Sequence, residues 1–159
     1  MKYFYRLLEG SPQGTLMNAL LQRPEVFTTT AMDGVQELTV REQGPDGVVT
    51  DQAGAREFAG LKRLSLAAMQ MTDGTMLGRS VLLRVDAKVT MPIGNSAMDL
   101  ASYAVVLHAE PNVMILAGDE SVLIRGGEIW WIDLKSDAHL INKSEDEVFI
   151  MIVDVRIDP

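Results

Sequence analysis

The chain has 159 residues, 47% of them hydrophobic and 23% charged, which suits one compact domain with a sizeable core. The formal net charge is −8 and no run of Lys or Arg is present, which excludes a nucleic-acid partner. The absence of cysteine excludes disulfides and thiolate metal sites. No stretch approaches the roughly 20 apolar residues of a membrane span, and the first residues lack the apolar core of a signal peptide. We therefore expect a soluble, cytoplasmic protein without a membrane partner.

The first 60 residues predict a short helix followed by loops. In "SPQGTLMNALLQRPE", Ser11 and Pro12 suit the first turn of a helix, and Leu16, Leu20 and Leu21 lie on one of its faces. Residues 28–60 are rich in Thr, Gly, Asp and Gln, a composition typical of loops.

From about residue 61 the hydrophobic pattern changes to a period of two, which is typical of β-strands. The runs are "RLSLAAMQM", "SVLLRVDAKVTM", "YAVVLH", "NVMILAG", "SVLIRG", "EIWWID" and "EVFIMIVDV". Because a period-two face must be covered by another layer, these strands predict a sandwich, jelly roll or barrel. We predict a single domain over 1–159, with a helix and loop segment at 1–60 and a β core at 61–159.

Motifs for most common chemistries are missing. The sequence has no phosphate-binding glycine loop, no serine-hydrolase elbow and no zincin motif. Its two histidines, His108 and His139, are too few for a His-rich zinc site and by themselves indicate ordinary hydrogen-bonded residues. Acidic groups such as residues 145–147 lie in predicted turns, where solvated side chains are expected. Trp130 and Trp131 face opposite sides of a strand, so one is expected in the core and the other in an interface or pocket wall.

The segment "GGEIWWIDLKSDAHLINKSEDEVFIMIVDVR" resembles the C-terminal half of the aspartyl/asparaginyl β-hydroxylase family. Members are iron(II)- and 2-oxoglutarate-dependent dioxygenases with a double-stranded β-helix fold. The residues that fall where the family pattern puts them are Gly127, Glu128, Trp130, Trp131, Asp133, His139, Asn142, Ser144 and Asp154. The resemblance implies a mainly β, cupin-like jelly roll with a short N-terminal helix.

The same resemblance implies an iron site that this chain lacks. The family holds iron with His-x-Asp and a distal His, and only the distal position, His139, is kept. Ile93 and Asn95 stand at the other two ligand positions. Neither replaces its counterpart, because isoleucine has no donor atom and an amide oxygen carries no charge.

The positions that would hold the cosubstrate also differ. Val148 stands where the family has the arginine of its "DR" pair, and Ser102 and Ala104 stand in place of its Arg-x-His. A carboxylate such as that of 2-oxoglutarate is best held by a bidentate arginine, so these replacements leave the cosubstrate without its anchor.

The leading hypothesis is a non-catalytic, dioxygenase-like β-helix that acts as a binding or structural module, with no cofactor and with a protein partner or self-association. Because the family occurs in phage as well as bacteria, a viral structural role and a location in the virion are further implications of the resemblance. The candidate pocket or interface residues are Ile93, Asn95, Ser102, Ala104, Trp130, Trp131 and Val148.

Two alternatives stay open. The first is an active hydroxylase of aspartyl or asparaginyl residues that uses iron(II) and 2-oxoglutarate at a rearranged metal site. In it, His108 and His139 converge with a carboxylate such as Asp133 or Glu110. The second is that the resemblance reflects only shared β patterning, which predicts strand connectivity other than a jelly roll.

Overall fold

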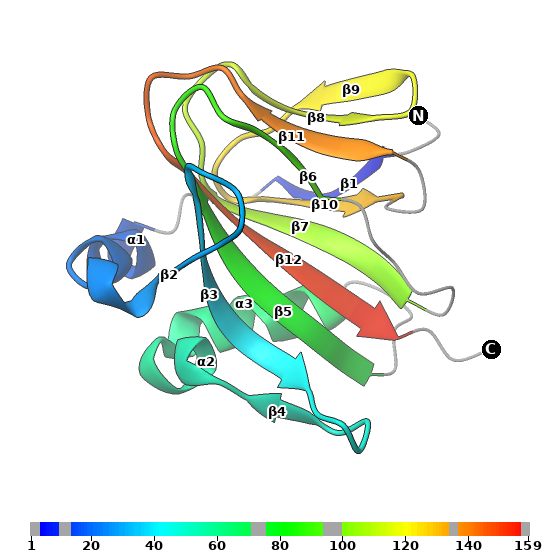
Figure 1. Ribbon diagram of the computed structural model, residues 1–159. Coiled ribbons are helices and arrows are strands. Elements are labelled where there is room, and N and C mark those ends of the chain that lie inside the picture. Colours follow the sequence, from blue (N-terminus) through cyan, green and yellow to red (C-terminus); the bar gives the residue numbers. More distant parts are fainter. Residues whose placement is uncertain (1–3, 10–13, 71–75, 94–99, 134–136, 157–159) are drawn as a thin grey trace.

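The structure is a computed structural model that describes residues 4–9, 14–70, 76–93, 100–133 and 137–156. In these ranges, two antiparallel β-sheets pack face to face, and helices cover one side (Figure 1). The elements in chain order are β1 (Phe4–Glu9), α1 (Gly14–Leu21), the 3-10 helix η1 (Pro24–Val26), β2 (Thr28–Thr29), β3 (Val35–Gln43), β4 (Val49–Asp51), α2 (Ala53–Glu57), α3 (Ala59–Gln70), β5 (Met76–Val85), β6 (Thr90–Pro92), β7 (Leu100–His108), β8 (Val113–Ala117), β9 (Glu120–Leu123), β10 (Glu128–Ile132), β11 (Ala138–Asn142) and β12 (Val148–Arg156).

The connectivity is that of a double-stranded β-helix. The main sheet has the order β1-β10-β7-β12-β5-β3-β2, with β4 paired to β3, and the minor sheet has the order β6-β11-β8-β9. From β5 onward the chain passes back and forth between the sheets, so β5, β7, β10 and β12 face β6, β8, β9 and β11. The predicted jelly roll is confirmed, and the alternative of mere shared β patterning is wrong because it required another connectivity.

One hydrophobic core fills the space between the sheets. Successive residues of a strand point to opposite faces, so Val148 and Ile150 of β12 enter this core while Phe149 and Met151 point to the other side. The minor sheet supplies Ile115 and Leu140, both 0% exposed. The interior of the barrel is therefore packed with side chains from both sheets.

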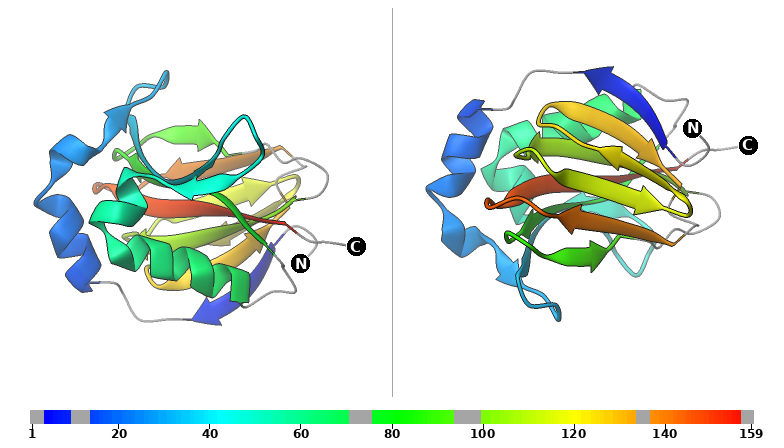
Figure 2. Two further views of the ribbon diagram at one scale, coloured as in Figure 1. Left: turned by 90° about the horizontal axis from the view of Figure 1, so that it is seen from below. Right: turned by 90° about the horizontal axis from the view of Figure 1, so that it is seen from above.

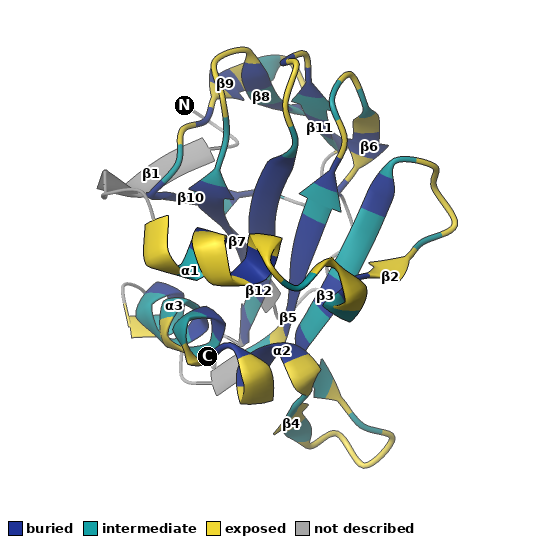
Figure 3. Ribbon diagram, turned by 90° about the vertical axis from the view of Figure 1, so that its left-hand side faces the viewer, coloured by how far each residue is buried: buried dark blue, intermediate teal, exposed yellow. Residues whose placement is uncertain are grey.

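A second core lies on the outer face of the main sheet, where the helices pack (Figure 2). It joins Leu20 of α1 and Leu61 of α3 to Phe149 and Met151 of β12. Because β12 is buried on both faces, its sequence is apolar almost without interruption (Figure 3). None of the helices in the described ranges has the length and apolar character needed to cross a bilayer.

Two of the predicted elements are wrong. The run "RLSLAAMQM" is not a strand, because residues 59–70 form α3 and bury Leu61, Ser65 and Ala68 at helical spacing. Residues 35–43, predicted as loop, form β3 and pair with β5 in the main sheet. The first 60 residues thus contribute strands to the main sheet rather than only a preface.

The predicted N-terminal helix is present as α1, and of its expected face Leu16 and Leu20 pack in the helical core while Leu21 does not. Met17 and Leu20 are buried, whereas Leu21 is 51% exposed. The predicted first-turn residues Ser11 and Pro12 lie outside the described residues.

Replacing Leu140 with alanine should destabilise the fold strongly. Leu140 is fully buried between the sheets, so the substitution removes apolar contacts and leaves a cavity, and we expect a loss of about 2–5 kcal/mol in the free energy of unfolding. Urea denaturation followed by tryptophan fluorescence measures this loss. Leu123→Ala is the matched control, because Leu123 is 60% exposed and its truncation should change stability by less than about 0.5 kcal/mol. Equal losses in the two variants would contradict the packing described here.

Candidate functional site

The fold brings together the two segments in which the resemblance places the iron ligands. Strand β6 pairs with β11, with His139 opposite Pro92, so the chain just after Pro92 lies beside the start of β11. Ile93 is 9% exposed and belongs to the core between the sheets. Asn95 lies outside the described residues. At the described ligand position of this segment, the barrel receives a hydrocarbon side chain and no metal donor.

His139 does not point into the barrel. In β11 the buried residues are Ala138, Leu140 and Asn142, whereas His139 and Ile141 lie on the opposite, outer face of the minor sheet. The inward position at the start of β11 is therefore held by Ala138. A metal ligand that faces the barrel would have to stand one position before or after His139 in this strand.

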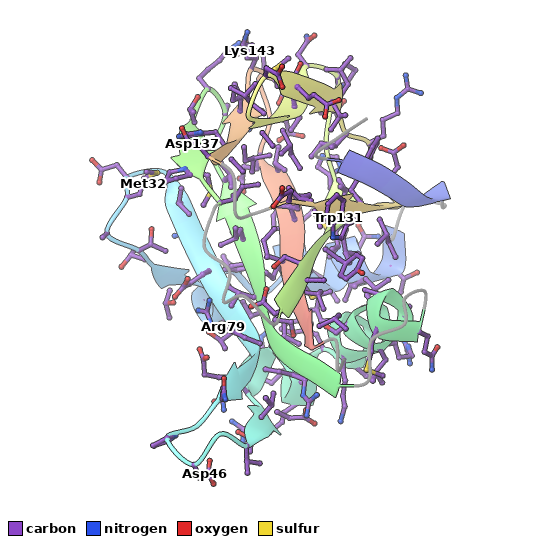
Figure 4. All side chains as sticks on the ribbon, turned by 90° about the vertical axis from the view of Figure 1, so that its right-hand side faces the viewer. Met32, Asp46, Arg79, Trp131, Asp137 and Lys143 are labelled. Atoms are coloured by element: carbon purple, nitrogen blue, oxygen red, sulfur yellow. The ribbon has the colours of Figure 1, made fainter. Side chains whose placement is uncertain are left out.

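The expectation of an ordinary hydrogen bond for His139 stays a prediction. The His139 Nδ1 atom lies 3.7 Å from the Asp137 Oδ1 atom, which is too long for a hydrogen bond. Figure 4 marks this end of β11 with Asp137, whose side chain is 89% exposed. His139 is thus a surface histidine beside one solvated carboxylate.

Three more of the predicted pocket residues are core residues. Ala104, Trp130 and Val148 all belong to the core between the sheets. In the described chain the buried polar residues are Ser65, Ser80, Ser102, Glu128, Asn142 and Ser144, and none of them is cationic. Among the described residues, this core therefore presents no buried cation to 2-oxoglutarate. Trp131 points the other way and packs half-buried against the helical core (Figure 4).

Ser102 and Asp154 form a polar pair at neighbouring positions of β7 and β12. The Ser102 hydroxyl donates a hydrogen bond of 2.8 Å to the Asp154 Oδ1 atom. Burial raises the pKa of the Asp154 carboxyl, and the bond from Ser102 opposes that rise only in part. The pair is one carboxyl and one hydroxyl, a donor set too small to hold iron.

Two other residues of the family pattern serve as structural supports. Asn142 is 1% exposed, and its amide donates hydrogen bonds to the carbonyl oxygens of Val85, Asp86 and Asp146 at 3.4, 3.0 and 2.8 Å. Its Oδ1 atom accepts bonds from the backbone and hydroxyl of Ser144 at 3.0 and 2.6 Å. These contacts tie the β5–β6 turn to the β11–β12 turn.

Glu128 plays a similar part at the start of β10. It is 5% exposed, and its Oε1 atom accepts a 2.7 Å bond from the Arg125 backbone and a 3.2 Å bond from the Trp130 indole. The preceding Gly127 has a φ of 91°, a left-handed conformation that glycine adopts without strain. The Gly-Glu-x-Trp part of the family pattern thus forms a turn together with the hydrogen bonds that stabilise it.

A different cluster of metal-ligating side chains forms where β7 ends and β12 begins. The His108 Nε2 atom lies 3.2 Å from Asp146 Oδ2 and 3.8 Å from Glu110 Oε1. Within the described ranges, this is the only group of three His or carboxylate side chains whose donor atoms all lie within 4.8 Å of one another. A hydrogen bond from the Glu147 backbone and then one from His108 lower the pKa of the Asp146 carboxyl.

The cluster only partly matches the rearranged site considered from the sequence. His108 and Glu110 do meet, but the third member is Asp146. His139 belongs elsewhere, because β11 places Ala138 opposite Ala117 and Asn142 opposite Val113, so His139 lies toward the barrel end away from residues 108–113. Asp133 follows β10, which ends at Ile132 opposite Ser102, also toward that far end.

A surface pocket of about 340 Å³ adjoins this cluster, between α1 and the ends of β7 and β12. Its lining combines the apolar residues Met17, Leu21, Leu107 and Phe149 with the polar residues His108 and Asp146. By sequence alone, Asp146 is one of several acidic turn residues whose side chains are expected to be solvated. No local pattern connects it to His108, which lies 38 residues earlier in the chain.

The sequence matches no protein-family model and no curated protein. The fold, however, is shared with solved oxygenases. An oxidoreductase of the 2OG-Fe(II) oxygenase family from Burkholderia pseudomallei superposes with a TM-score of 0.67 at 8% identity, over 99% of this chain and 85% of that one. A prolyl hydroxylase from Trichoplax adhaerens, in complex with a peptide fragment of hypoxia inducible factor, gives a TM-score of 0.62 at 12% identity, over 96% and 82% of the chains.

A non-heme alpha-ketoglutarate-dependent carbocyclase from nogalamycin biosynthesis also gives a TM-score of 0.62, at 10% identity, over 96% of this chain and 79% of that one. At such low identities the likeness establishes the fold alone. The chain therefore has the double-stranded β-helix fold seen in these oxygenases.

Replacing Asp154 with asparagine should stabilise the protein near neutral pH. Because the pKa of Asp154 is raised above its ordinary value of 3.8, the folded chain releases this proton at a higher pH than the unfolded chain does. The resulting stability is fully present below about pH 4 and is lost as the pH rises through the raised pKa. Asparagine stays neutral and can still accept the Ser102 hydrogen bond. We expect a gain on the order of 1 kcal/mol at pH 7 that shrinks toward pH 4.

Denaturant unfolding at both pH values measures the Asp154 effect. Asp33→Asn, at an exposed position, is the control and should leave the difference between the two pH values unchanged. A gain of equal size at pH 4 and pH 7 in Asp154→Asn would show that burial of the carboxyl is not the cause.

Proposed function

We propose that this chain is a non-catalytic protein with the fold of 2-oxoglutarate oxygenases, derived from the aspartyl/asparaginyl β-hydroxylase family, and that it acts by binding another molecule through its surface. The observation that carries the proposal is the packing of the barrel interior. Ile93, Ala104 and Val148, which stand at positions where the family binds metal or cosubstrate, are all part of the core.

The donor set of the barrel does not fit iron. Iron(II) in this fold needs three protein ligands with open positions for 2-oxoglutarate and oxygen. Ile93 supplies no donor atom and His139 faces away from the core. The Asp154 carboxyl accepts a hydrogen bond from the Ser102 hydroxyl and is attracted by the Arg79 guanidinium, neither of which is an iron ligand. An ion there would lose its hydration without gaining enough ligands in return.

The cosubstrate meets a second obstacle, which is electrostatic. 2-Oxoglutarate carries two carboxylates, and transfer of such a charge into a closed site requires a cation to compensate for the lost hydration. None of the buried side chains in the described chain is Arg, Lys or His. The cosubstrate would also have to displace packed side chains such as Val148 and Ile150, both 0% exposed.

We infer a protein partner, which includes a second copy of this chain. The net charge of −8 disfavours any polyanionic partner. Large hydrophobic side chains stand exposed on the described surface, among them Leu123 at 60% and Val48 at 53%. Such side chains become buried in protein interfaces.

Titration with 2-oxoglutarate tests the proposed loss of the active site. Calorimetry with manganese(II), a redox-inert substitute for iron(II), should give no 2-oxoglutarate heat at any metal concentration, and incubation with iron(II) should produce no succinate. The measurement is repeated on His108→Ala, so that metal held at the surface cluster is not mistaken for metal in the barrel.

A metal-dependent 2-oxoglutarate heat at one equivalent per chain would overturn this proposal if it persists in His108→Ala. In that case His139→Ala decides the location. Loss of the heat in that variant would mean that β11 rearranges to turn His139 inward.

A further inference from the structure

We propose that His108, Glu110 and Asp146 bind one divalent metal ion of the zinc class at the rim of the pocket beside α1. This site lies outside the barrel core and does not depend on the proposed function.

The separations within the cluster suit a shared ion. Zinc bonds to histidine nitrogen and carboxylate oxygen are about 2.0–2.2 Å long, so donors around one tetrahedral ion lie about 3.4 Å apart. The His108 Nε2 atom is 3.2 Å from Asp146 Oδ2 and 3.8 Å from Glu110 Oε1. Glu110 is 49% exposed, so its side chain can rotate to close the remaining gap.

Asp146 is held in place by bonds that leave one carboxylate oxygen for an ion. Its carbonyl oxygen accepts a bond from the Asn142 amide at 2.8 Å, and its backbone N–H donates a 3.3 Å bond to the Ser144 hydroxyl. Its Oδ1 atom accepts a 2.8 Å bond from the Glu147 backbone, and its Oδ2 atom faces His108. Such supporting bonds orient metal ligands and strengthen binding. The pairing of β7 with β12 shifts register beside His108, and such bulges re-aim side chains.

The balance of charge also favours a cation at this place. Glu145 is paired with Lys88 at 2.7 Å, and both carboxylate oxygens of Glu147 bond to Arg84. Asp146 lies between these two residues in sequence. Among the described ion pairs, its one partner is the imidazole of His108, and Glu110 is paired with the same imidazole. One imidazole nitrogen cannot satisfy two carboxylates at once. A divalent ion removes their mutual repulsion and gives all three donors a common partner.

The adjoining pocket provides room for the remaining ligand of the ion. His108 and Asp146 are part of its lining, and Leu107 and Phe149 are part of its apolar wall. Three protein ligands with one open position are typical of zinc sites that take up a water or a substrate.

Calorimetric titration of the purified chain with zinc(II) tests the site. We expect one saturable site per chain, and a loss of affinity of at least about tenfold in each of His108→Ala, Glu110→Gln and Asp146→Asn. Asp146→Asn keeps the Oδ1 acceptor for the Glu147 backbone, so its fold should be preserved. Thermal unfolding without metal checks this for every variant.

His139→Ala is the matched control. It removes the only other histidine of a chain without cysteine, and it should leave zinc affinity unchanged within about twofold. Imidazole nitrogen NMR adds a second readout, in which zinc should shift the His108 resonances and not those of His139. The site is refuted if the wild-type chain shows no saturable binding, if His139→Ala loses it, or if any one of the three ligand variants binds as tightly as the wild type.

Discussion

The fold depends on the burial of β12 and its neighbours on both faces of the main sheet. One face packs against the minor sheet and the other against α1 and α3, so Val148, Phe149, Ile150 and Met151 are each no more than 1% exposed. A chain of this size gains most of its stability from such apolar burial. In this protein, the same strand therefore holds the minor sheet on one side and the helices on the other.

The strands from residue 80 onward were predicted well from the sequence. Each of them has either one polar and one apolar face or two apolar faces, and both patterns are easy to recognise. The prediction failed for α3, because Leu64, Leu66 and Ala68 alternate as a strand would while Leu61, Ser65 and Ala68 follow helical spacing. Both the strand period of two and the helical period fit this sequence. The segment forms a helix because that helix packs against β5, β7 and β12. Strand β3 was missed because its charged residues and polar surroundings suggested a loop, although pairing with β5 places it within the main sheet.

The candidate site was less predictable than the fold, for a geometric reason. A spacing motif locates a residue along a strand, but the side of the sheet that it faces changes with every residue. His139 fits the pattern by spacing and still lies on the outer face, one position away from the inward Ala138. The matching residues that do enter the interior, Glu128 and Asn142, hold turns rather than a metal. The family pattern therefore identified residues that stabilise the turns of the fold, and not metal ligands.

The two ends of the barrel consequently differ in what they can bind. At the end with Ile93 and Ala138, apolar packing leaves no described donor set for an ion. At the other end, the Asn142 bonds that fix the β11–β12 turn also hold Asp146 in front of His108. A turn that is rigid for structural reasons loses little further entropy when it binds a ligand, because the ordering has already taken place on folding. The hydrogen bonds that stabilise the β11–β12 turn thus also position the ligands of the proposed metal site. This site lies at the end of the barrel where the family pattern places no ligand.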